Sequence, residues 1–523
     1  MNNKNLLTVK EASIWASKLL NKNISESNIS YLIQYGKISK IKNGKKILID
    51  TNELAKYYND INKEQNYKNK LGKDINWALS FSELKETETT KHVHRLHPYK
   101  GKFIPQLVEY FLDSHTDEFK KETYFKKNDI ILDPFCGSGT TLVESNELNI
   151  HAVGIDISAF NTLITNSKIY KYDIENIIKE TDKINKNFNQ FLESRNNAEF
   201  ENALSNELKI FNNKYFPSPD YKININKKEI NEKQYGREKE SEFLPIYNKL
   251  IKQFKINIET GQNNFLDKWF LKTIKDEIYF IFEQIKTVQN KNTKIILNII
   301  LSRTIRSCRA TTHSDLATLI NPVTSTYYCK KHAKICKPIF SIKELWNKYT
   351  NDTIKRISEF NKIKTDTHQI CITGDGRNID ILSKLKLKLP ELANLIEEKG
   401  INGIFSSPPY IGLINYHEQH AYSYDLFNFK RNDELEIGPL TKGQGKKAKE
   451  DYIQGIADVL NNCKKLLTED FNIFLVANDK YNLYPEIIKR TDLKIVNEFK
   501  RPVLNRAEKN KIPYSETIFH IKK

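Results

Sequence analysis

Short apolar runs alternate with amphipathic stretches from about residue 103 onward, which is the pattern of a mostly parallel α/β sheet. The runs at 129–132 and 151–157 predict two buried strands, and residues 140–148 between them fit a helix. Together they predict one βαβ unit. Further strands are predicted at 369–373, 403–405 and 471–476.

Between these two groups of strands the sequence is rich in Lys, Asn and Glu and has helical periodicity, for instance over 265–285 and 293–306. The simplest interpretation is a doubly wound, Rossmann-like α/β sheet interrupted by a large, mainly helical insert. We therefore expect two separated parts of the chain to build one sheet.

The first 58 residues predict a separate small domain. Thr8 and Glu11 have the spacing of a capping box at the start of a helix, and residues 25–33 predict a second helix. Residues 38–49 predict two short strands around an Asn-Gly turn. This order resembles the winged helix-turn-helix of excisionase-like and MerR-like DNA-binding modules. The alternative is a small packing domain without DNA contact.

The charge of the chain bears on its partner. With 83 Lys and Arg residues against 65 Asp and Glu residues, the net charge is +18. Such an excess neutralises nucleic-acid phosphates. A lysine-rich composition set by codon bias explains it equally well, so charge alone leaves the partner open.

Cysteine usage and hydropathy point to the compartment. Six cysteines scattered over 523 residues do not form a disulfide framework. The N-terminus lacks the apolar run of a secretory signal, and stretches such as 295–301 are far shorter than the roughly 20 residues of a membrane span. We expect a soluble, cytoplasmic protein with no membrane partner.

The most informative segment is Asp-Pro-Phe-Cys-Gly-Ser-Gly-Thr-Thr at 133–141, which leaves a predicted strand, turns on two glycines and enters a helix. This geometry brings the backbone close to a ligand. Asp156, at the end of the next strand, can take both hydroxyls of an adenosine ribose. Leu142 replaces the third glycine of the dinucleotide fingerprint. The loop therefore fits a cofactor with a ribose but no pyrophosphate.

A second segment, Ser-Ser-Pro-Pro-Tyr at 406–410, directly follows another predicted strand. Its two prolines fix φ and remove two N–H donors, which leaves carbonyl and hydroxyl acceptors beside an aromatic ring. Such a site can accept hydrogen bonds from an exocyclic amino group while the ring stacks on the base. Taken alone, the segment would also fit a simple Pro-Pro turn.

Together these segments resemble the amino-group DNA methyltransferases that use S-adenosylmethionine and modify cytosine N4 or adenine N6. Residues 133–141 match the family's D-P-F-x-G-S-G-T-T loop at eight positions, and 407–410 match its S-P-P-Y motif. Residues 97–105 are similar to the segment that closes over the methionine part of the cofactor, and 374–377 to the G-D motif whose carboxylate faces the adenine. The similarity covers roughly 90–170 and 370–523.

The resemblance implies S-adenosylmethionine as cofactor, double-stranded DNA as substrate, and a methyltransferase sheet as fold. It assigns catalysis to Ser407, Pro408, Pro409 and Tyr410. It assigns cofactor binding to Tyr99, Lys100, Asp133, Pro134, Phe135, Gly137, Ser138, Gly139, Thr140, Asp156 and Asp375.

In the implied reaction the target base is turned out of the duplex. Tyr410 stacks on it, while the Ser407 hydroxyl and the Pro408 carbonyl accept hydrogen bonds from its amino group. None of the 15 prolines is followed by cysteine, so the Pro-Cys nucleophile of carbon-5 cytosine methylation is missing. Cys136 is interpreted as a packing residue.

In the family, serine before Pro-Pro-Tyr goes mostly with cytosine N4, and aspartate or asparagine with adenine N6. The resemblance thus favours a site-specific cytosine-N4 DNA methyltransferase of a restriction-modification system, with a separately acting cognate endonuclease as a partner. Adenine N6, or an amino group of RNA or of a protein glutamine, is the alternative within this chemistry. A DNA-binding regulator with an inactive methyltransferase fold is the alternative from another class.

Three soft-metal ligands, Cys329, His332 and Cys336, lie within eight residues, and Cys308 and His313 lie a short way upstream. Their spacing matches no standard zinc motif well. Ordinary residues of a basic segment explain them too, so no metal is assigned.

Basic residues predict the DNA contacts. Arg303, Arg306 and Arg309 recur every three residues and are expected along one helix face, and residues 441–449 predict a mobile basic loop. A solvated surface is the alternative for both. The residues expected to contact DNA are Asn28, Tyr31, Lys45, Lys46, Arg303, Arg306, Arg309, Lys446 and Lys447.

These observations predict five segments along the chain. They are a helix-turn-helix domain at 1–58, a linker at 59–90, the cofactor-binding half at 91–170, a helical insert for target recognition at 171–368, and the catalytic half at 369–523.

Overall fold

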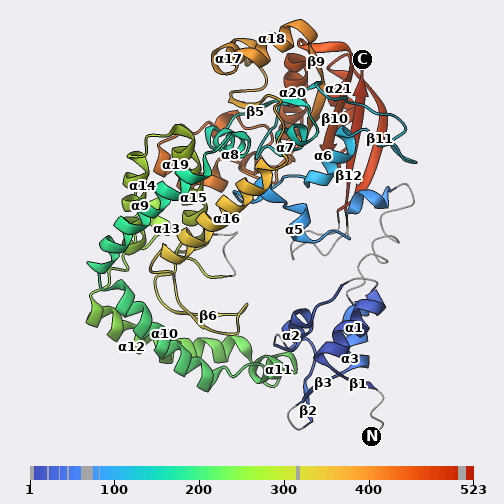
Figure 1. Cartoon of the computed structure of the whole chain (residues 1–523). Helices are drawn as coiled ribbons and strands as arrows, with labels where there is room; N and C mark the ends of the chain where they lie inside the picture. Colours follow the sequence, from blue (N-terminus) through green and yellow to red (C-terminus); the bar gives the residue numbers. More distant parts are fainter. Residues whose placement is uncertain are drawn as a thin grey trace. The chain divides into compact units, whose positions relative to one another are not determined.

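The computed structural model describes residues 5–20, 23–34, 36–43, 46–60, 75–81, 83–313, 319–503 and 514–523 (Figure 1). The chain forms two compact units. The first comprises Met1–Asn69, Asn187–Glu277 and Ser307–Ile342, and the second comprises Lys70–Lys186, Ile278–Arg306 and Lys343–Lys523. The insert expected at 171–368 therefore contributes residues to both units.

The second unit contains a seven-stranded sheet in the order β11-β12-β10-β9-β4-β5-β8. The five strands from β10 to β8 run parallel, whereas β12 is antiparallel to both of its neighbours, β10 and β11. All five predicted strands are present, and β11 and β12 at one edge are additional. The strands are β4 (Ile130–Asp133), β5 (His151–Asp156), β8 (Gln369–Thr373), β9 (Ile401–Ser406), β10 (Leu467–Ala477), β11 (Lys494–Pro502) and β12 (Ser515–Lys522).

Alternating apolar side chains bury both faces of this sheet. Ile130 and Leu132 of β4 pack into one core cluster, and Ile131 between them packs into another on the opposite face. One face is covered by α17 (Ile381–Lys388), α18 (Pro390–Lys399), α20 (Lys446–Lys464) and α21 (Tyr484–Lys489). The other is covered by α6 (Pro105–Leu112), α7 (Thr140–Glu147), α8 (Ala159–Ile169), α15 (Lys291–Ser307) and α16 (Lys343–Asn361).

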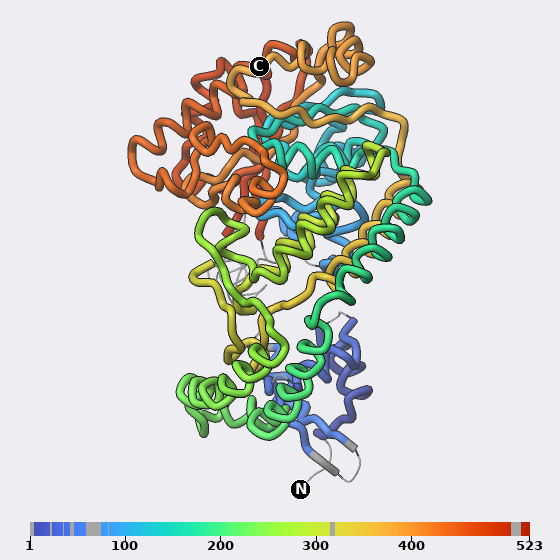
Figure 2. Tube along the Cα trace, turned by 90° about the vertical axis from the view of Figure 1, so that its left-hand side faces the viewer, coloured from blue at the N-terminus to red at the C-terminus, as the bar shows by residue number. Residues whose placement is uncertain are grey.

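Two long helices extend the layer of helices on this second face of the sheet. The beginning of α9 (Ile174–Glu193) runs alongside α16, as the tube in Figure 2 shows. The indole Nε1 of Trp346 donates to Asn185 Oδ1 over 2.8 Å between them. The remaining helices of this unit are α5 (Glu86–Thr89) and α19 (Ala421–Phe427), and α14 (Lys272–Lys286) contributes residues to both units.

The order of the strands determines where a ligand can bind. From β4 the chain continues to β5 and β8 on one side, and it returns to β9 and β10 on the other. Parallel α/β sheets bind ligands at such a switch point, outside the carboxyl ends of the strands. Here those ends are Asp133 of β4 and Ser406 of β9.

The first unit begins with a three-stranded sheet and three helices. The Thr8 N–H donates to Glu11 Oε2 over 2.9 Å and the Glu11 N–H to Thr8 Oγ1 over 3.3 Å, which confirms the predicted capping box. The predicted helices and hairpin are present, and β1 adds a strand with sheet order β1-β3-β2. The elements are β1 (Leu6–Thr8), α1 (Val9–Leu20), α2 (Glu26–Gln34), β2 (Ile41–Asn43), β3 (Lys46–Asp50) and α3 (Thr51–Asp60).

Further helices and one small hairpin lie in the rest of the first unit. Its helices are α10 (Asn197–Tyr215), α11 (Asp220–Asn226), α12 (Glu232–Phe254) and α13 (Phe265–Trp269). Its hairpin consists of β6 (Tyr327–Cys329) and β7 (Lys334–Cys336).

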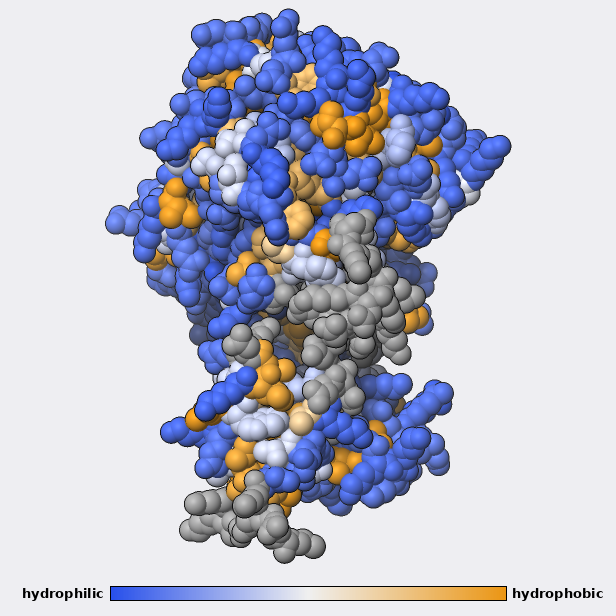
Figure 3. Space-filling model, turned by 90° about the vertical axis from the view of Figure 1, so that its right-hand side faces the viewer, coloured by the Kyte–Doolittle hydropathy of each residue, from blue (hydrophilic) through white to orange (hydrophobic). Residues whose placement is uncertain are grey.

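The described part of the chain contains no helix whose length and apolarity would let it cross a membrane. Hydrophilic residues predominate on the face shown in Figure 3, and the apolar patches among them are small and scattered.

Candidate active site

A cavity opens at the carboxyl ends of β4, β5, β8 and β9, at the switch point of the sheet. The space between its walls measures about 850 Å³ with the open solvent at its mouth included. Ten of the predicted site residues line it: Tyr99, Asp133, Pro134, Phe135, Gly137, Thr140, Asp156, Asp375, Ser407 and Pro409. Five others adjoin these in sequence but are not among the lining residues: Lys100, Ser138, Gly139, Pro408 and Tyr410.

The glycine loop after β4 can exist only because two of its residues lack side chains. Gly137 and Gly139 have φ values of 53° and 76°, in the left-handed region. A Cβ atom on Gly139 would lie 2.5 Å from Cγ2 of Thr165, and one on Gly137 would lie 3.0 Å from the Tyr99 hydroxyl. The loop therefore forms a tight cradle beneath the cavity, and Gly139 caps helix α7.

Asp156 joins this loop to β5. Its Oδ2 accepts from the Gly137 N–H over 2.8 Å, and its Oδ1 accepts from the Ser158 N–H over 2.8 Å and from Asn161 Nδ2 over 3.1 Å. Burial raises the pKa of Asp156 to about 6, although these donors oppose the shift. A carboxylate offers about four lone-pair directions, so three donors leave one on Oδ2 for a ligand hydroxyl.

The carboxylate of Asp375 follows β8 and is held in place by its neighbour. Arg377 Nε lies 2.9 Å from Asp375 Oδ1, and Arg377 Nη2 lies 2.6 Å from Oδ2, a forked pair. The Gly374 N–H donates to the Asp156 carbonyl over 3.0 Å. The G-D segment is thereby fixed beside β5 and faces the cavity.

One hydrogen bond joins the two signature segments. Ser406 Oγ, at the end of β9, donates to Asp133 Oδ1, at the end of β4, over 2.6 Å. Both residues are buried, and burial raises the pKa of Asp133 to about 6. Segments 273 residues apart in sequence therefore meet at the base of one cavity.

Two hydrogen bonds hold the last two residues of the Ser-Pro-Pro-Tyr segment after β9. The Tyr452 hydroxyl donates to the Pro409 carbonyl over 2.8 Å, and Tyr452 in turn lies 3.2 Å from the Tyr484 hydroxyl. The Tyr410 hydroxyl donates to Glu516 Oε1 of β12 over 2.7 Å. The Tyr410 ring is thereby fixed, and Tyr410 and Ser407 are both half-buried.

Sequence reasoning missed several residues of the cavity wall, among them Lys102, Asn161 and Glu436. Lys102 Nζ donates to the His94 carbonyl over 2.9 Å, and burial lowers the pKa of Lys102 to about 8. Glu436 accepts from the Tyr416 N–H over 3.0 Å and from the His417 N–H over 2.8 Å. Tyr416 and His417 follow the Pro-Pro-Tyr segment closely, whereas nothing in the local sequence singles out Glu436.

The structure changes the interpretation of the three arginines. Helix α15 ends at Ser307, so Arg309 does not share a helix face with Arg303 and Arg306, and that prediction was wrong. Arg303 is buried, its Nη1 lies 2.7 Å from Asp352 Oδ2, and its guanidinium lies 4.4 Å from the centroid of the Tyr349 ring. The positive charge of Arg303 is therefore paired with Asp352 inside the protein.

The other predicted DNA contacts lie at the surface or outside the described residues. Asn28 and Tyr31 are exposed on α2. Lys446 and Lys447 are exposed in the first turn of α20, so the loop expected at 441–449 was wrong beyond residue 445. Lys45 and the side chain of Lys46 lie outside the described residues. A role of these residues in DNA binding stays a prediction.

The sheet and the cavity at its switch point define an α/β methyltransferase. A family model described as DNA methylase (N6_N4_Mtase) matches residues 1–167, which include the glycine loop. The chain is 47 % identical over 527 residues to the Type II methyltransferase M.MjaII of Methanocaldococcus jannaschii, with 99 % of this chain and 97 % of that protein covered. It therefore belongs to the amino-group DNA methyltransferase family, and it groups with the Type II methyltransferases of restriction-modification systems.

Two further relatives are similar over smaller parts. The chain is 36 % identical to the Type II methyltransferase M.MvaI of Kocuria varians over 112 residues, which are 21 % of this chain and 23 % of that protein. It is 23 % identical to the Type II methyltransferase M.BsoBI of Geobacillus stearothermophilus over 381 residues, which are 65 % of this chain and 72 % of that protein.

The cofactor of the family is S-adenosylmethionine, and the cavity fits it. Gly137 lets the loop approach the Tyr99 ring at the wall of the cavity, and the free lone pair of Asp156 suits a ribose hydroxyl. Asp375 and the ring of Tyr99 complete the wall around this space.

Proposed function

We propose that the protein methylates the exocyclic N4 of cytosine at a specific site in double-stranded DNA, as the modification enzyme beside a separate restriction endonuclease. The hydrogen bond from Ser406 to Asp133 carries the proposal, because it joins the cofactor loop to the Ser-Pro-Pro-Tyr segment around one cavity. Serine at position 407 is the residue that favours cytosine over adenine.

The side chains of the cavity have distinct proposed roles. Asp156 accepts from one ribose hydroxyl of the cofactor, and Asp375, kept in place by Arg377, faces its adenine. Bound S-adenosylmethionine supplies a methyl group on a positively charged sulfur. The chain itself needs no nucleophile, because positioning of the amino nitrogen provides most of the rate.

The target base is positioned by the segment after β9. The ring of Tyr410, held by Glu516, stacks on the base turned out of the duplex. The Ser407 hydroxyl and the Pro408 carbonyl accept hydrogen bonds from its amino group, which draws the nitrogen lone pair out of conjugation with the ring.

Nucleoside mass spectrometry tests the choice of base. The purified protein is incubated with plasmid DNA and S-adenosylmethionine, and the DNA is digested to nucleosides. We expect N4-methylcytosine, and finding only N6-methyladenine would overturn the assignment to cytosine. A protein that binds the cofactor but methylates no DNA would instead support a regulator with an inactive fold. Sequencing of the modified DNA at single-base resolution then gives the recognition site.

A further inference from the structure

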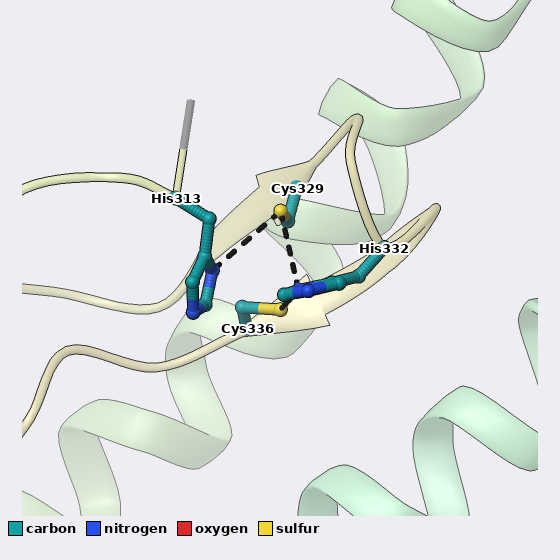
Figure 4. Close-up of side chains that lie close together, drawn as sticks. All are labelled: His313, Cys329, His332 and Cys336. Carbon is teal, nitrogen blue, oxygen red and sulfur yellow. Dashed lines mark hydrogen bonds between the residues drawn. The ribbon is translucent and has the colours of Figure 1, made fainter. Parts of the chain in front are cut away.

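Four side chains of the first unit converge on one point (Figure 4). His313, Cys329, His332 and Cys336 each offer a ligand atom, and all four atoms lie within 4.8 Å of one another. Cys329 is the last residue of β6, Cys336 is the last residue of β7, and His332 lies in the turn between these strands. His313 comes from a segment sixteen residues before Cys329.

Three sulfur–nitrogen distances among these atoms match a tetrahedral metal site. Cys329 Sγ lies 3.6 Å from Nδ1 of His313 and 3.6 Å from Nδ1 of His332, and Cys336 Sγ lies 3.5 Å from Nδ1 of His332. With Zn–S bonds of about 2.3 Å and Zn–N bonds of about 2.0–2.1 Å, a tetrahedron separates sulfur from nitrogen by about 3.6 Å. The side chains are therefore already spaced as ligands.

The turn of the hairpin orients two of the ligands. The Cys329 carbonyl accepts from the N–H of His332 over 3.1 Å and from that of Ala333 over 2.7 Å. Ala333 has a φ of 51°, so the chain reverses tightly and returns His332 toward Cys329. This local geometry explains how a Cys-x2-His-x3-Cys spacing brings three ligands together.

The surrounding helices hold the hairpin from behind. Glu240 of α12 accepts from the Tyr328 N–H over 3.0 Å, and Asn212 of α10 exchanges two hydrogen bonds with the backbone of Ile335, of 2.9 and 3.0 Å. These polar groups fix the strands in place, and this leaves the Cys and His side chains turned toward one another on the other side of the turn (Figure 4).

The apolar core of the hairpin is too small to explain this convergence. Each strand has three residues, and the core cluster consists of Tyr327, Cys329 and Cys336, with Val323 packed against it. Two of the three core residues are potential metal ligands, so a bound ion would provide the cross-link that apolar packing does not.

We propose that His313, Cys329, His332 and Cys336 bind one Zn²⁺ ion in a closed structural site. Thiolate and imidazole ligands in a tetrahedron select zinc over the hard cations, and a full set of four protein ligands leaves no position for substrate. The ion ties the segment of His313 to the β6–β7 hairpin. The Tyr327 hydroxyl, 2.8 Å from His313 Nδ1, gives up its hydrogen bond to that nitrogen when the metal binds. This inference is independent of the methyltransferase activity.

Metal analysis of the full-length protein tests the site. Purified under reducing conditions without chelator, the protein is expected to contain about one zinc per chain. The double variant C329S/C336S is expected to contain almost none. Cys308→Ala is the matched control, because Cys308 is a buried free cysteine of the same unit outside the cluster, and it should retain zinc. Tyr327→Phe should retain zinc as well.

Cobalt substitution keeps the test valid even where a variant fails to fold. The metal-free wild-type protein is titrated with Co²⁺, and we expect the intense visible absorption of tetrahedral cobalt with a thiolate charge-transfer band, both abolished by added Zn²⁺. A weak octahedral spectrum would overturn the proposal, as would wild-type protein without zinc or full zinc content in the double variant. A Cys329–Cys336 disulfide in the reduced preparation, seen as a loss of two hydrogens by mass spectrometry, would do the same.

Discussion

The methyltransferase cavity and the Cys/His cluster are assembled in opposite ways. The cavity collects side chains from Tyr99 to Val459 around the ends of four strands, and the sheet beneath them is buried on both faces. The cluster takes its four ligands from only 24 residues, and three of them lie on a hairpin whose core cluster has three buried members. A large core keeps its site in place when one side chain changes, whereas a small core depends on the chemistry of the site itself.

Removal of zinc is the change with the largest expected effect. Structural zinc sites contribute on the order of 10 kcal/mol to folding, so chelation should expose the β6–β7 hairpin and lower the stability of the first unit by several kcal/mol. Hydrogen exchange of the full-length protein, followed by peptide, measures this. The β6–β7 peptides should exchange faster, while those of β4 and β5 stay protected. Equal loss of protection in both units would contradict the comparison.

Gly139→Ala tests the conformation of the glycine loop beside the cavity. The new Cβ would meet Thr165 at 2.5 Å in a backbone conformation that costs about 1–3 kcal/mol for other residues, so the affinity for S-adenosylmethionine should fall roughly ten- to 100-fold. Gly445→Ala is the control, since its φ is −68° and no atom lies within 4 Å of the added Cβ. Calorimetric titration measures both. Unchanged affinity in Gly139→Ala would show that the loop does not contact the cofactor.

Tyr410→Ala distinguishes the contribution of base stacking from that of cofactor binding. Loss of base stacking, worth about 1–3 kcal/mol, should lower the methylation rate roughly ten- to 100-fold and leave the affinity for S-adenosylmethionine nearly intact. Tyr410→Phe keeps the ring and loses only the hydrogen bond to Glu516, so its rate should stay closer to the wild type. Filter binding and single-turnover methylation provide the two readouts. Equal loss of both in Tyr410→Ala would contradict the assigned role.

Lowering the pH should weaken cofactor binding by a smaller amount, which grows as the pH falls. Burial raises the pKa of Asp156 to about 6, so below that pH the carboxyl takes up a proton and loses its free acceptor, and the affinity should fall by up to about tenfold per pH unit. Because the pKa is higher in the folded than in the unfolded chain, this group's contribution to stability falls as pH rises from about 4 to about 6. Acid therefore weakens binding without destabilising the fold through Asp156.

Asp156→Asn provides the control for the pH dependence, since an amide does not titrate. Its affinity should be lower than that of the wild type at pH 8 and nearly constant down to pH 5. Asp133 also has a pKa raised to about 6, and a slope that persists in Asp156→Asn but disappears in Asp133→Asn would move the effect to Asp133.

The local sequence was enough to predict much of the fold and the centre of the site. The five parallel strands follow from apolar runs, and the glycine loop and the Ser-Pro-Pro-Tyr segment follow from turn chemistry that depends on adjacent residues. The edge strand β11 was missed because its first half is largely exposed, so it lacks an apolar run to mark it. The arginine interpretation failed because it assumed that a helix continued past Ser307.

The residues alone therefore determine the local structures that neighbours in the chain create: a strand, a tight turn, a capping box and a Pro-Pro corner. Three contacts required the folded chain, namely Ser406 with Asp133, Glu436 with His417, and His313 with Cys329. The first two contacts have the same physical reason. Their residues lie on separate elements and meet only when burial of both faces of the sheet brings strand ends and loops together. His313 meets Cys329 because the hairpin folds back toward it. This contact adds a fourth ligand to the three that lie on the hairpin.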